Sequence, residues 1–406
     1  MLQNKVPNVR FCKYLDIWKT TKLNRITEII GGGTPDTKQF SYWNGGINWF
    51  SPTEVGKTVY LTKSEKTISQ LGLQKSSAKL LPAFKTILFT SRAGIGDVGI
   101  LTEESATNQG FQSLVVNEET DVYFLYSYSD QIKKYALKHS AGSTFLEISG
   151  KELGKMDLSI PSLPEQQAIG SFFRTLDDLL MSYKDNLAYY QSLKATMLSE
   201  MFPKAGHKVP EIRLDRFEGE WGKYCLGDIF EQVSNYIEPS VENELWSLTV
   251  EKGLTPKTDR YKRDFLVKKN DKFKKVDVNE FVYNPMNLTL GALDLNDNEV
   301  TISVSGYYVV MKNRDKEKFD NDFLKIILKT TYAIYQYKQF ATGTLIEKQR
   351  VQFPTFSEIP FYLPSIAEQQ AIGAYFSNLD NLINSHQEKI IQLETLKKKL
   401  LQDMFI

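Results

Sequence analysis

The sequence predicts an α+β protein in which two domains of mixed α and β structure are separated and joined by two long helices. Two observations lead to this fold: a repeat that covers both halves of the chain, and a run of heptads at the end of each half. We expect the helices to pair as an intramolecular antiparallel coiled coil, which makes the molecule pseudo-two-fold symmetric. A chain of 406 residues is long enough for two such domains, each with its own core.

The repeat keeps a constant offset of 203 residues, from Pro161 to Pro364. The segment PSLPEQQAIGSFFRTLDDLL begins at the first of these prolines, and PSIAEQQAIGAYFSNLDNLI begins at the second. The same offset relates residues 6–10 (VPNVR) to residues 209–213 (VPEIR). The chain therefore consists of two copies of one unit, each a variable region followed by a long helix.

The repeat and one linker set the predicted boundaries. The linker is rich in Pro, Gly and Lys and has no apolar period. The predicted parts are a first domain at 1–160, a first helix at 161–202, the linker at 203–210, a second domain at 211–362 and a second helix at 363–406.

Both long helices open with an S-x-x-E pattern, which is typical of a capping box, and capping alone would explain the glutamate of the shared E-Q-Q motif. Apolar side chains then recur every seven residues, with a second row between them, over about 37 residues and about 55 Å of helix. The predicted seam and partner-contact residues are Ile169, Phe172, Leu176, Leu179 and Leu193 in the first helix, and Ile372, Leu379, Leu382, Leu393 and Leu396 in the second. In the second helix a flanking row of Phe376, Ile383 and Ile390 widens the apolar stripe. His386 also lies on this seam, where a packed residue is the expected role.

The variable regions are predicted to share one order of elements. Strands are expected at 86–90, 98–101 and 111–116 in the first region, and at 280–283, 300–304 and 307–312 in the second. An amphipathic helix is expected to follow at 122–138 and at 323–339. Outside the repeated ends the side chains differ almost completely, which indicates one scaffold with two different ligand surfaces.

Composition and motifs argue against several classes of protein. The net charge is +1 and 41% of residues are hydrophobic, without an apolar run that could span a membrane or serve as a signal peptide, so we expect a cytoplasmic protein. Two cysteines without a CxxC pattern and three scattered histidines predict neither a disulfide framework nor a metal site. No P-loop pattern occurs.

Two further motifs resemble catalytic signatures. Residues 94–99 fit G-x-G-x-x-G, but no helix is expected at the third glycine, so a β-turn explains them better than a dinucleotide site. Residues 283–286 (YNPM) are similar to an adenine methyltransferase motif, but methionine stands where that motif has proline, and an Asn-Pro turn is the simpler interpretation. We predict no catalytic residue on this chain.

Polar turns and one basic segment are the candidate nucleic-acid contacts. Arg reads guanine and Asn or Gln reads adenine through paired hydrogen bonds, whereas Lys and Arg follow phosphates. Residues 259–277 carry eight basic and four acidic side chains with aromatic residues between them, although a solvated hairpin face would look the same. The candidates are Thr34, Lys38, Tyr42, Asn44, Ser91, Arg92, Asn108, Gln109, Ser143 and Thr144 in the first domain, and Lys262, Arg263, Lys268, Lys269, Lys272, Lys274, Asn284, Asn287, Thr344 and Lys348 in the second.

Taken together, these motifs resemble one family over essentially the whole chain: the DNA specificity (S) subunit, HsdS, of type I restriction-modification systems. The resemblance rests on the duplicated P-S-[LI]-x-E-Q-Q-A-I-G openings, on L-x-x-I at 23 and 226, on GGGTP followed by YWNGGINWFSP, and on SRAGIGDVGI followed by TNQGF. A lone E-Q-Q would not be specific.

The resemblance implies that the two domains are target recognition domains, each reading one half of a bipartite, asymmetric site in double-stranded DNA. It implies that the family's conserved helices set the spacer and dock two methyltransferase (M) subunits. These modify adenine N6 with S-adenosylmethionine, and two restriction (R) subunits cut DNA with ATP and magnesium. The chain itself would carry no cofactor and would act in the cytoplasm, at the nucleoid of a bacterial or archaeal cell.

Two other functions are compatible with parts of the sequence. A two-headed coiled-coil adaptor or scaffold that does not bind DNA would also need unlike end domains, but its contacts should depend little on salt. A nucleotide-dependent enzyme would rest on residues 94–99 alone and would require saturable cofactor binding.

Overall fold

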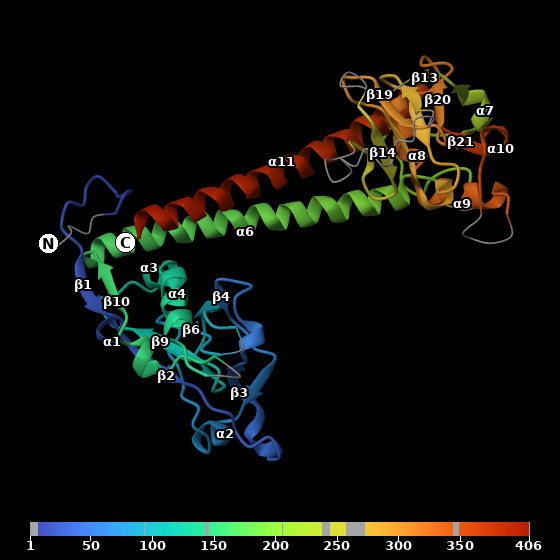
Figure 1. Cartoon of the computed structure of the whole chain (residues 1–406). Helices are drawn as coiled ribbons and strands as arrows, with labels where there is room; N and C mark the ends of the chain where they lie inside the picture. The colour runs from blue at the N-terminus through green and yellow to red at the C-terminus, as the bar shows by residue number, and fades with distance from the viewer. Residues whose placement is uncertain are drawn as a thin grey trace. The chain divides into compact units, whose positions relative to one another are not determined.

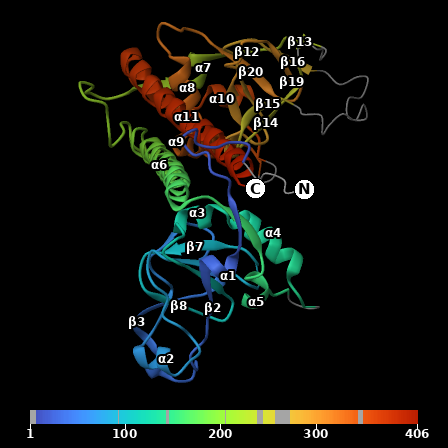
Figure 2. The same ribbon diagram turned by 90° about the vertical axis from the view of Figure 1, so that its left-hand side faces the viewer.

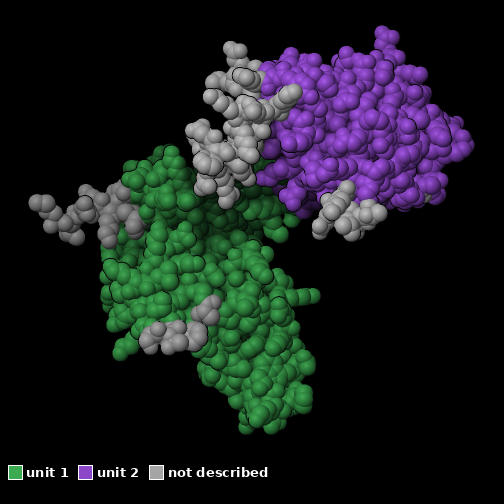
Figure 3. All heavy atoms as spheres, turned by 45° about the vertical axis from the view of Figure 1, so that its right-hand side comes forward, with its two compact units in different colours: residues 1–185, 387–406 green, residues 186–386 purple. Residues whose placement is uncertain are grey.

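The structure is a computed structural model, and it describes residues 7–92, 94–142, 146–204, 206–237, 244–256, 273–343 and 349–405. The chain forms two compact units: unit 1 contains residues 1–185 and 387–406, and unit 2 contains residues 186–386 (Figure 3). Each unit has one mixed α and β domain and about half of each long helix, so the α+β fold predicted from the sequence is confirmed.

The long helices are α6 (Leu163–Glu200) and α11 (Ile366–Met404), which run side by side in each unit (Figure 1). In unit 1, Lys184 pairs with Glu394 at 2.6 Å, and Asp177 pairs with Lys397. In unit 2, Lys194 pairs with Asp380. Residue numbers rise along one helix as they fall along the other, so the pairing is antiparallel.

The seam is built from one of the two predicted apolar rows and from a row one residue further on. Ile169, Leu176, Ile372, Leu379 and Leu393 are buried, and Leu193 is half-buried. Phe172, Leu179, Leu382 and Leu396 are instead 36–47% exposed, because Phe173, Leu180, Phe376, Ile383 and Ile390 take the buried positions. The exposed row remains a predicted contact with partner proteins.

The described residues of unit 1 form three sheets. The five-stranded sheet has the order β2 (Thr27–Gly31), β9 (Gln112–Val116), β6 (Thr86–Phe89), β7 (Val98–Leu101) and β4 (Tyr60–Leu61). The three-stranded sheet has the order β5 (Lys66–Ile68), β3 (Trp43–Phe50) and β8 (Ser105–Thr107), and β1 (Lys19–Lys22) pairs with β10 (Asp157–Ile160). The helices are α1 (Leu23–Ile26), η1 (Phe40–Tyr42), η2 (Pro52–Glu54), α2 (Gln70–Gln74), α3 (Val122–Ser127), α4 (Ser129–His139) and α5 (Gly150–Leu153). Within this unit, α2 and β3 lie at the end away from α3 (Figure 2).

Unit 2 repeats the plan of unit 1. Its larger sheet has the order β12 (Phe230–Val233), β20 (Val309–Asn313), β17 (Phe281–Tyr283) and β18 (Leu293–Leu295). Smaller sheets contain β13 (Tyr236–Ile237), β16 (Phe273–Val276) and β19 (Ile302–Ser305), then β14 (Trp246–Thr249) with β15 (Gly253–Pro256), and β11 (Gly222–Cys225) with β21 (Pro360–Leu363). The helices are α7 (Leu226–Ile229), η4 (Leu288–Leu290), α8 (Asn321–Ile327), α9 (Thr331–Phe340) and α10 (Phe353–Ser357).

The single amphipathic helix expected in each variable region is in fact two helices. Tyr128 has ψ of −2°, which ends α3 before α4 begins. In unit 2, the Thr330 hydroxyl accepts the N–H of Ala333 at 3.3 Å and so starts α9 as a new helix. Hydrophobic periodicity is the same on both sides of such a break, so the pattern alone predicted one continuous helix.

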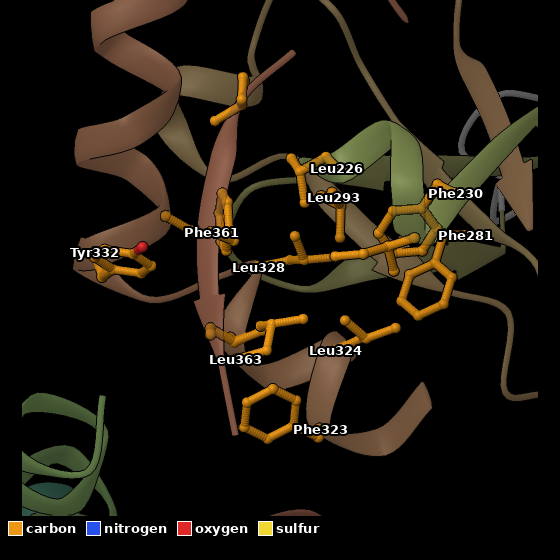
Figure 4. Close-up of a cluster of buried hydrophobic side chains, with 14 of the residues drawn as sticks. Leu226, Phe230, Phe281, Leu293, Phe323, Leu324, Leu328, Tyr332, Phe361 and Leu363 are labelled. Carbon is orange, nitrogen blue, oxygen red and sulfur yellow. The ribbon is translucent and has the colours of Figure 1, made fainter. Parts of the chain in front are cut away.

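Each unit closes its core with the end of a long helix. In unit 2, side chains from α7, β17, α8 and β21 converge in the core (Figure 4). Phe202, just beyond α6, packs against Phe323 with 5.9 Å between the ring centroids. In unit 1, Phe405, just beyond α11, packs 5.0 Å from Tyr128. Among the described residues, no helix has the length and apolar character needed to cross a membrane.

Candidate nucleic-acid interface

Three polar segments that the sequence singled out meet at one edge of the large sheet in unit 1. The N–H of Ser91 donates to the carbonyl of Gly110 at 2.8 Å, and the N–H of Ile148 donates to the carbonyl of Ser91 at 3.1 Å. Ala141 and Glu147 exchange two backbone hydrogen bonds of 3.0 Å, and Glu147 also pairs with Arg92 as an isolated β-bridge. We call residues 90–92, 108–111 and 141–147, where described, the loop edge of unit 1.

The glycine-rich loop at 31–35 packs onto this loop edge. The Thr34 hydroxyl donates to Oε1 of Gln109 at 2.5 Å, and the N–H of Gly33 donates to the carbonyl of Thr107 at 2.8 Å. A Cβ at Gly32 would lie 1.9 Å from the carbonyl oxygen of Asn108, so only glycine allows the backbones to approach this closely. The loop therefore places Thr34 and Gln109 side by side on the surface.

The predicted contacts of unit 1 differ in accessibility. Thr34, Lys38, Asn44 and Gln109 are exposed, and Tyr42, Arg92 and Asn108 are half-buried, whereas Ser91 is fully buried. Asn108 uses its Oδ1 to accept the N–H of Gly110 at 2.8 Å, which is a turn role. Lys38 lies in the turn before η1, Tyr42 is the last residue of η1, and Asn44 lies at the start of β3.

Unit 2 builds the same edge from different residues. The N–H of Val351 donates to the carbonyl of Pro285 at 3.0 Å, which repeats the bond between Ile148 and Ser91. Thr342 and Arg350 exchange backbone hydrogen bonds of 3.0 and 2.9 Å, as Ala141 and Glu147 do in unit 1. Residues 284–287, 305–308 and 342–350, where described, form the loop edge of unit 2, and Met286, 51% exposed, takes the place of Arg92.

Asn284 and Asn287 lie on the loop edge of unit 2. Oδ1 of Asn284 accepts the N–H of Met286 at 3.0 Å, which is the turn interpretation of the YNPM segment. Asn287 is exposed, and its backbone carbonyl accepts the N–H of Ala292 at 3.1 Å. The sheet register places this turn next to the start of β20, because Tyr283 pairs with Val309.

Sequence reasoning missed Tyr307, which is 89% exposed on the turn between β19 and β20. This turn precedes β20 as the turn at 108–111 precedes β9. The signal that could have found it is an aromatic pair directly after a glycine between two short strands.

Lys274, predicted as a contact, is only 7% exposed, and its amine donates to the carbonyl of Tyr308 at 2.7 Å. Burial lowers its pKa below the usual range for lysine. Its side chain therefore supports the Tyr307 turn from inside the domain. Nine other candidates lie outside the described residues: Ser143, Thr144, Lys262, Arg263, Lys268, Lys269, Lys272, Thr344 and Lys348.

The glycine motif at 94–99 does not form a dinucleotide site. Gly99 lies inside β7, and a Cβ there would be 2.6 Å from the Leu61 side chain, so this glycine serves strand packing. Gly94 and Gly96 have φ of +116° and +97°, as a turn requires. The part of the chain that the structure describes contains no group of three His, Cys, Asp or Glu side chains able to hold a metal ion.

Comparison with known proteins gives one family. Residues 16–188 and 218–395 match the model of the type I restriction modification DNA specificity domain. The chain is 31% identical over 236 residues to the MjaIX specificity subunit of Methanocaldococcus jannaschii, which covers 55% of this chain and 54% of that one. It is 30% identical over 179 residues to the EcoR124I/EcoR124II specificity subunit of Escherichia coli, and the match covers 42% of this chain and 43% of that one. The chain thus spans about half the length of these curated relatives.

Solved structures show the same fold. The type I restriction-modification S subunit from M. genitalium superposes with a TM-score of 0.59 at 15% identity, over 99% of both chains. The HsdS subunit from Thermoanaerobacter tengcongensis gives 0.50 at 15% identity, over 96% of both. Because the family model matches each half of the chain separately, as the repeat requires, the chain belongs to the type I restriction modification DNA specificity family.

Proposed function

We propose that this chain is the sequence-reading subunit of a type I restriction-modification complex, and that each loop edge reads one half of a bipartite, asymmetric DNA site. The observation that carries the proposal is that one backbone edge is built twice with unlike side chains. Ser91 and Arg92 of unit 1 are replaced by Pro285 and Met286 in unit 2, and the carbonyls of Ser91 and Pro285 accept matching hydrogen bonds from Ile148 and Val351. Two readers with one geometry and different chemistry suit a site with two different halves.

The exposed chemistry of each edge suits base recognition. Arg92 can bind guanine through two hydrogen bonds, and the Thr34–Gln109 pair presents an amide that can bind adenine. On unit 2, Met286 and Tyr307 supply apolar and aromatic contacts, while Asn287 supplies an amide. The basic residues between 260 and 272 would hold the phosphate backbone.

The long helices would set the unspecified gap between the half-sites and dock two methyltransferase subunits through their exposed apolar row. The chain itself would be non-catalytic and without a cofactor. Partner subunits would methylate adenine N6 with S-adenosylmethionine, and two restriction subunits would cut with ATP and magnesium. This function belongs in the cytoplasm, at the nucleoid of a bacterial or archaeal cell, where such DNA lies.

The test is a base-by-base map of adenine methylation in the source genome, with and without this gene. We expect the deletion to abolish methylation at one two-part motif with a fixed gap. An unchanged map in cells that contain an active methyltransferase partner would contradict the proposal and favour an adaptor that binds only proteins. Salt titration of the reconstituted complex on DNA separates the two, because phosphate contacts weaken steeply with ionic strength.

A further inference from the structure

The motif E-Q-Q-A-I-G at the start of each long helix makes contacts that helix capping does not explain. Gln166 is 1% exposed, and its Oε1 accepts the N–H of Asp121 at 3.1 Å. Its Nε2 donates to the carbonyls of Glu119 at 3.3 Å and of Pro161 at 3.1 Å. One side chain on α6 thus binds the loop that leads into α3 of the recognition domain.

The same contacts occur in unit 2. Gln369 is also 1% exposed, and its Oε1 accepts the N–H of Asp320 at 2.9 Å. Its Nε2 donates to the carbonyls of Lys318 at 3.3 Å and of Pro364 at 2.9 Å. All three hydrogen bonds are therefore repeated between α11 and the loop before α8.

The residues that these glutamines hold are themselves helix caps. Asp121 accepts the N–H of Phe124 at 2.8 Å and so starts α3, and Asp320 accepts the N–H of Phe323 at 2.8 Å and so starts α8. Burial raises the pKa of Asp121, as expected for a carboxyl enclosed between two helices. Each long helix is thus fastened to the residue that starts α3 or α8 in its own unit.

The glycine that ends the motif allows this close approach. A Cβ at Gly170 would lie 2.2 Å from Oδ1 of Asp121 and 2.9 Å from the backbone nitrogen of Phe124. At Gly373 the closest atom to such a Cβ would be Oδ1 of Asp320, 3.1 Å away. The glutamine and the glycine lie one helical turn apart on the same face of the long helix. The glutamine binds the domain, and the glycine leaves room for the close approach.

We propose that this motif is a docking clamp that fixes the angle of each recognition domain on its long helix, and that Gln166 and Gln369 are positioning residues for the length of the DNA gap. The inference rests on the proposed function. A domain that rotates on its helix moves its loop edge along the DNA without changing the bases that the edge can bind. Loss of the clamp should therefore weaken the preference for one gap length, while the bases preferred within each half-site stay the same.

The test compares Gln166→Ala with Gln167→Ala, because Gln167 is the next residue of the same motif but is exposed. Each complex is reconstituted with its methyltransferase and given duplexes that carry the two half-sites with the cognate gap, or with one base pair more or fewer. We expect Gln166→Ala to reduce the preference for the cognate gap at least tenfold while base preference within the half-sites is unchanged. Gln167→Ala should behave as the wild type.

Equal loss of methylation on all three gaps, or a gap preference like that of the wild type, would overturn the clamp. If Gln166→Ala does not fold, Gln369→Ala in unit 2 is expected to reduce the preference for the cognate gap in the same way. A gap preference like that of the wild type in Gln369→Ala would overturn the proposal. A wild-type complex that methylates no two-part site would instead refute the proposed function.

Discussion

Arg10 binds both carboxylate oxygens of Glu165, at 2.7 and 2.8 Å, from 155 residues away in the chain. Glu165 is 1% exposed, and Arg213 repeats the pairing with Glu368 at 2.8 and 2.6 Å in unit 2. The glutamate of the E-Q-Q motif therefore has a structural role that the sequence interpretation missed. It ties the segment that leads into each domain to the helix that leaves it.

Glu165→Ala should destabilise unit 1 by about 3–5 kcal/mol, because it leaves the Arg10 guanidinium enclosed without its counter-charge. Urea denaturation followed by an optical probe in unit 1 measures the change. Glu118→Ala is the matched control, since Glu118 pairs with Lys85 on the open surface and should show no measurable change. Equal stability of Glu165→Ala and the wild type would show that the buried pair contributes nothing.

Gly170→Ala and Gly373→Ala should differ although they change matching residues. The first places a methyl group 2.2 Å from Oδ1 of Asp121, so we expect a loss of about 1–3 kcal/mol. The second places a methyl group 3.1 Å from Oδ1 of Asp320, which is a milder contact. The better helix propensity of alanine, about 1 kcal/mol, should offset this crowding. Thermal unfolding of the two variants tests the difference, and similar losses in both would contradict the closer approach of α6 to α3 than of α11 to α8.

Arg92→Ala should weaken specific DNA binding by about 1–3 kcal/mol and relax one base of the first half-site only. The physical reason is that Arg92→Ala removes a pair of hydrogen bonds to one guanine. The loop edge of unit 2 is unchanged, so recognition of the second half-site should be unchanged too. Affinity measured on a panel of single-base changes in both half-sites checks this. A uniform loss on every sequence would make Arg92 a phosphate contact, and Met286→Ala, at the matching place, should affect only the second half-site.

Lys274→Met should leave the salt dependence of DNA binding unchanged, because its amine is buried against the carbonyl of Tyr308. Lys38→Met, which removes an exposed cation, should lower the slope of log K against log salt by about 0.9 if that lysine touches a phosphate. Binding by the reconstituted complex at several salt concentrations gives both slopes. A fall of the same size for Lys274→Met would place its charge on the DNA.

The sequence predicted what periodicity and repetition encode and missed what depends on tertiary contact. The repeat gave the two units and the pairing of α6 with α11, since a seven-residue period is a local signal. Burial of Lys274 and Ser91 could not be predicted, because polar residues at strand ends look alike whether the next strand covers them or not. Tyr307 was missed for the opposite reason, since an aromatic residue beside a strand is usually expected in the core.

Removing one heptad from each long helix should shorten the gap in the DNA site. Residues 184–190 and 386–392 are suitable, because Tyr190 packs 5.3 Å from His386 and the deletion keeps the facing residues in register. Seven residues span about 10.5 Å of helix, so the gap should lose about three base pairs at about 3.4 Å each. Methylation mapping with the shortened chain measures the gap directly. Deleting the heptad from α6 alone is the control, since it should break the register and abolish methylation. A full-strength motif with the original gap after both deletions would show that the helices do not set the distance between the half-sites.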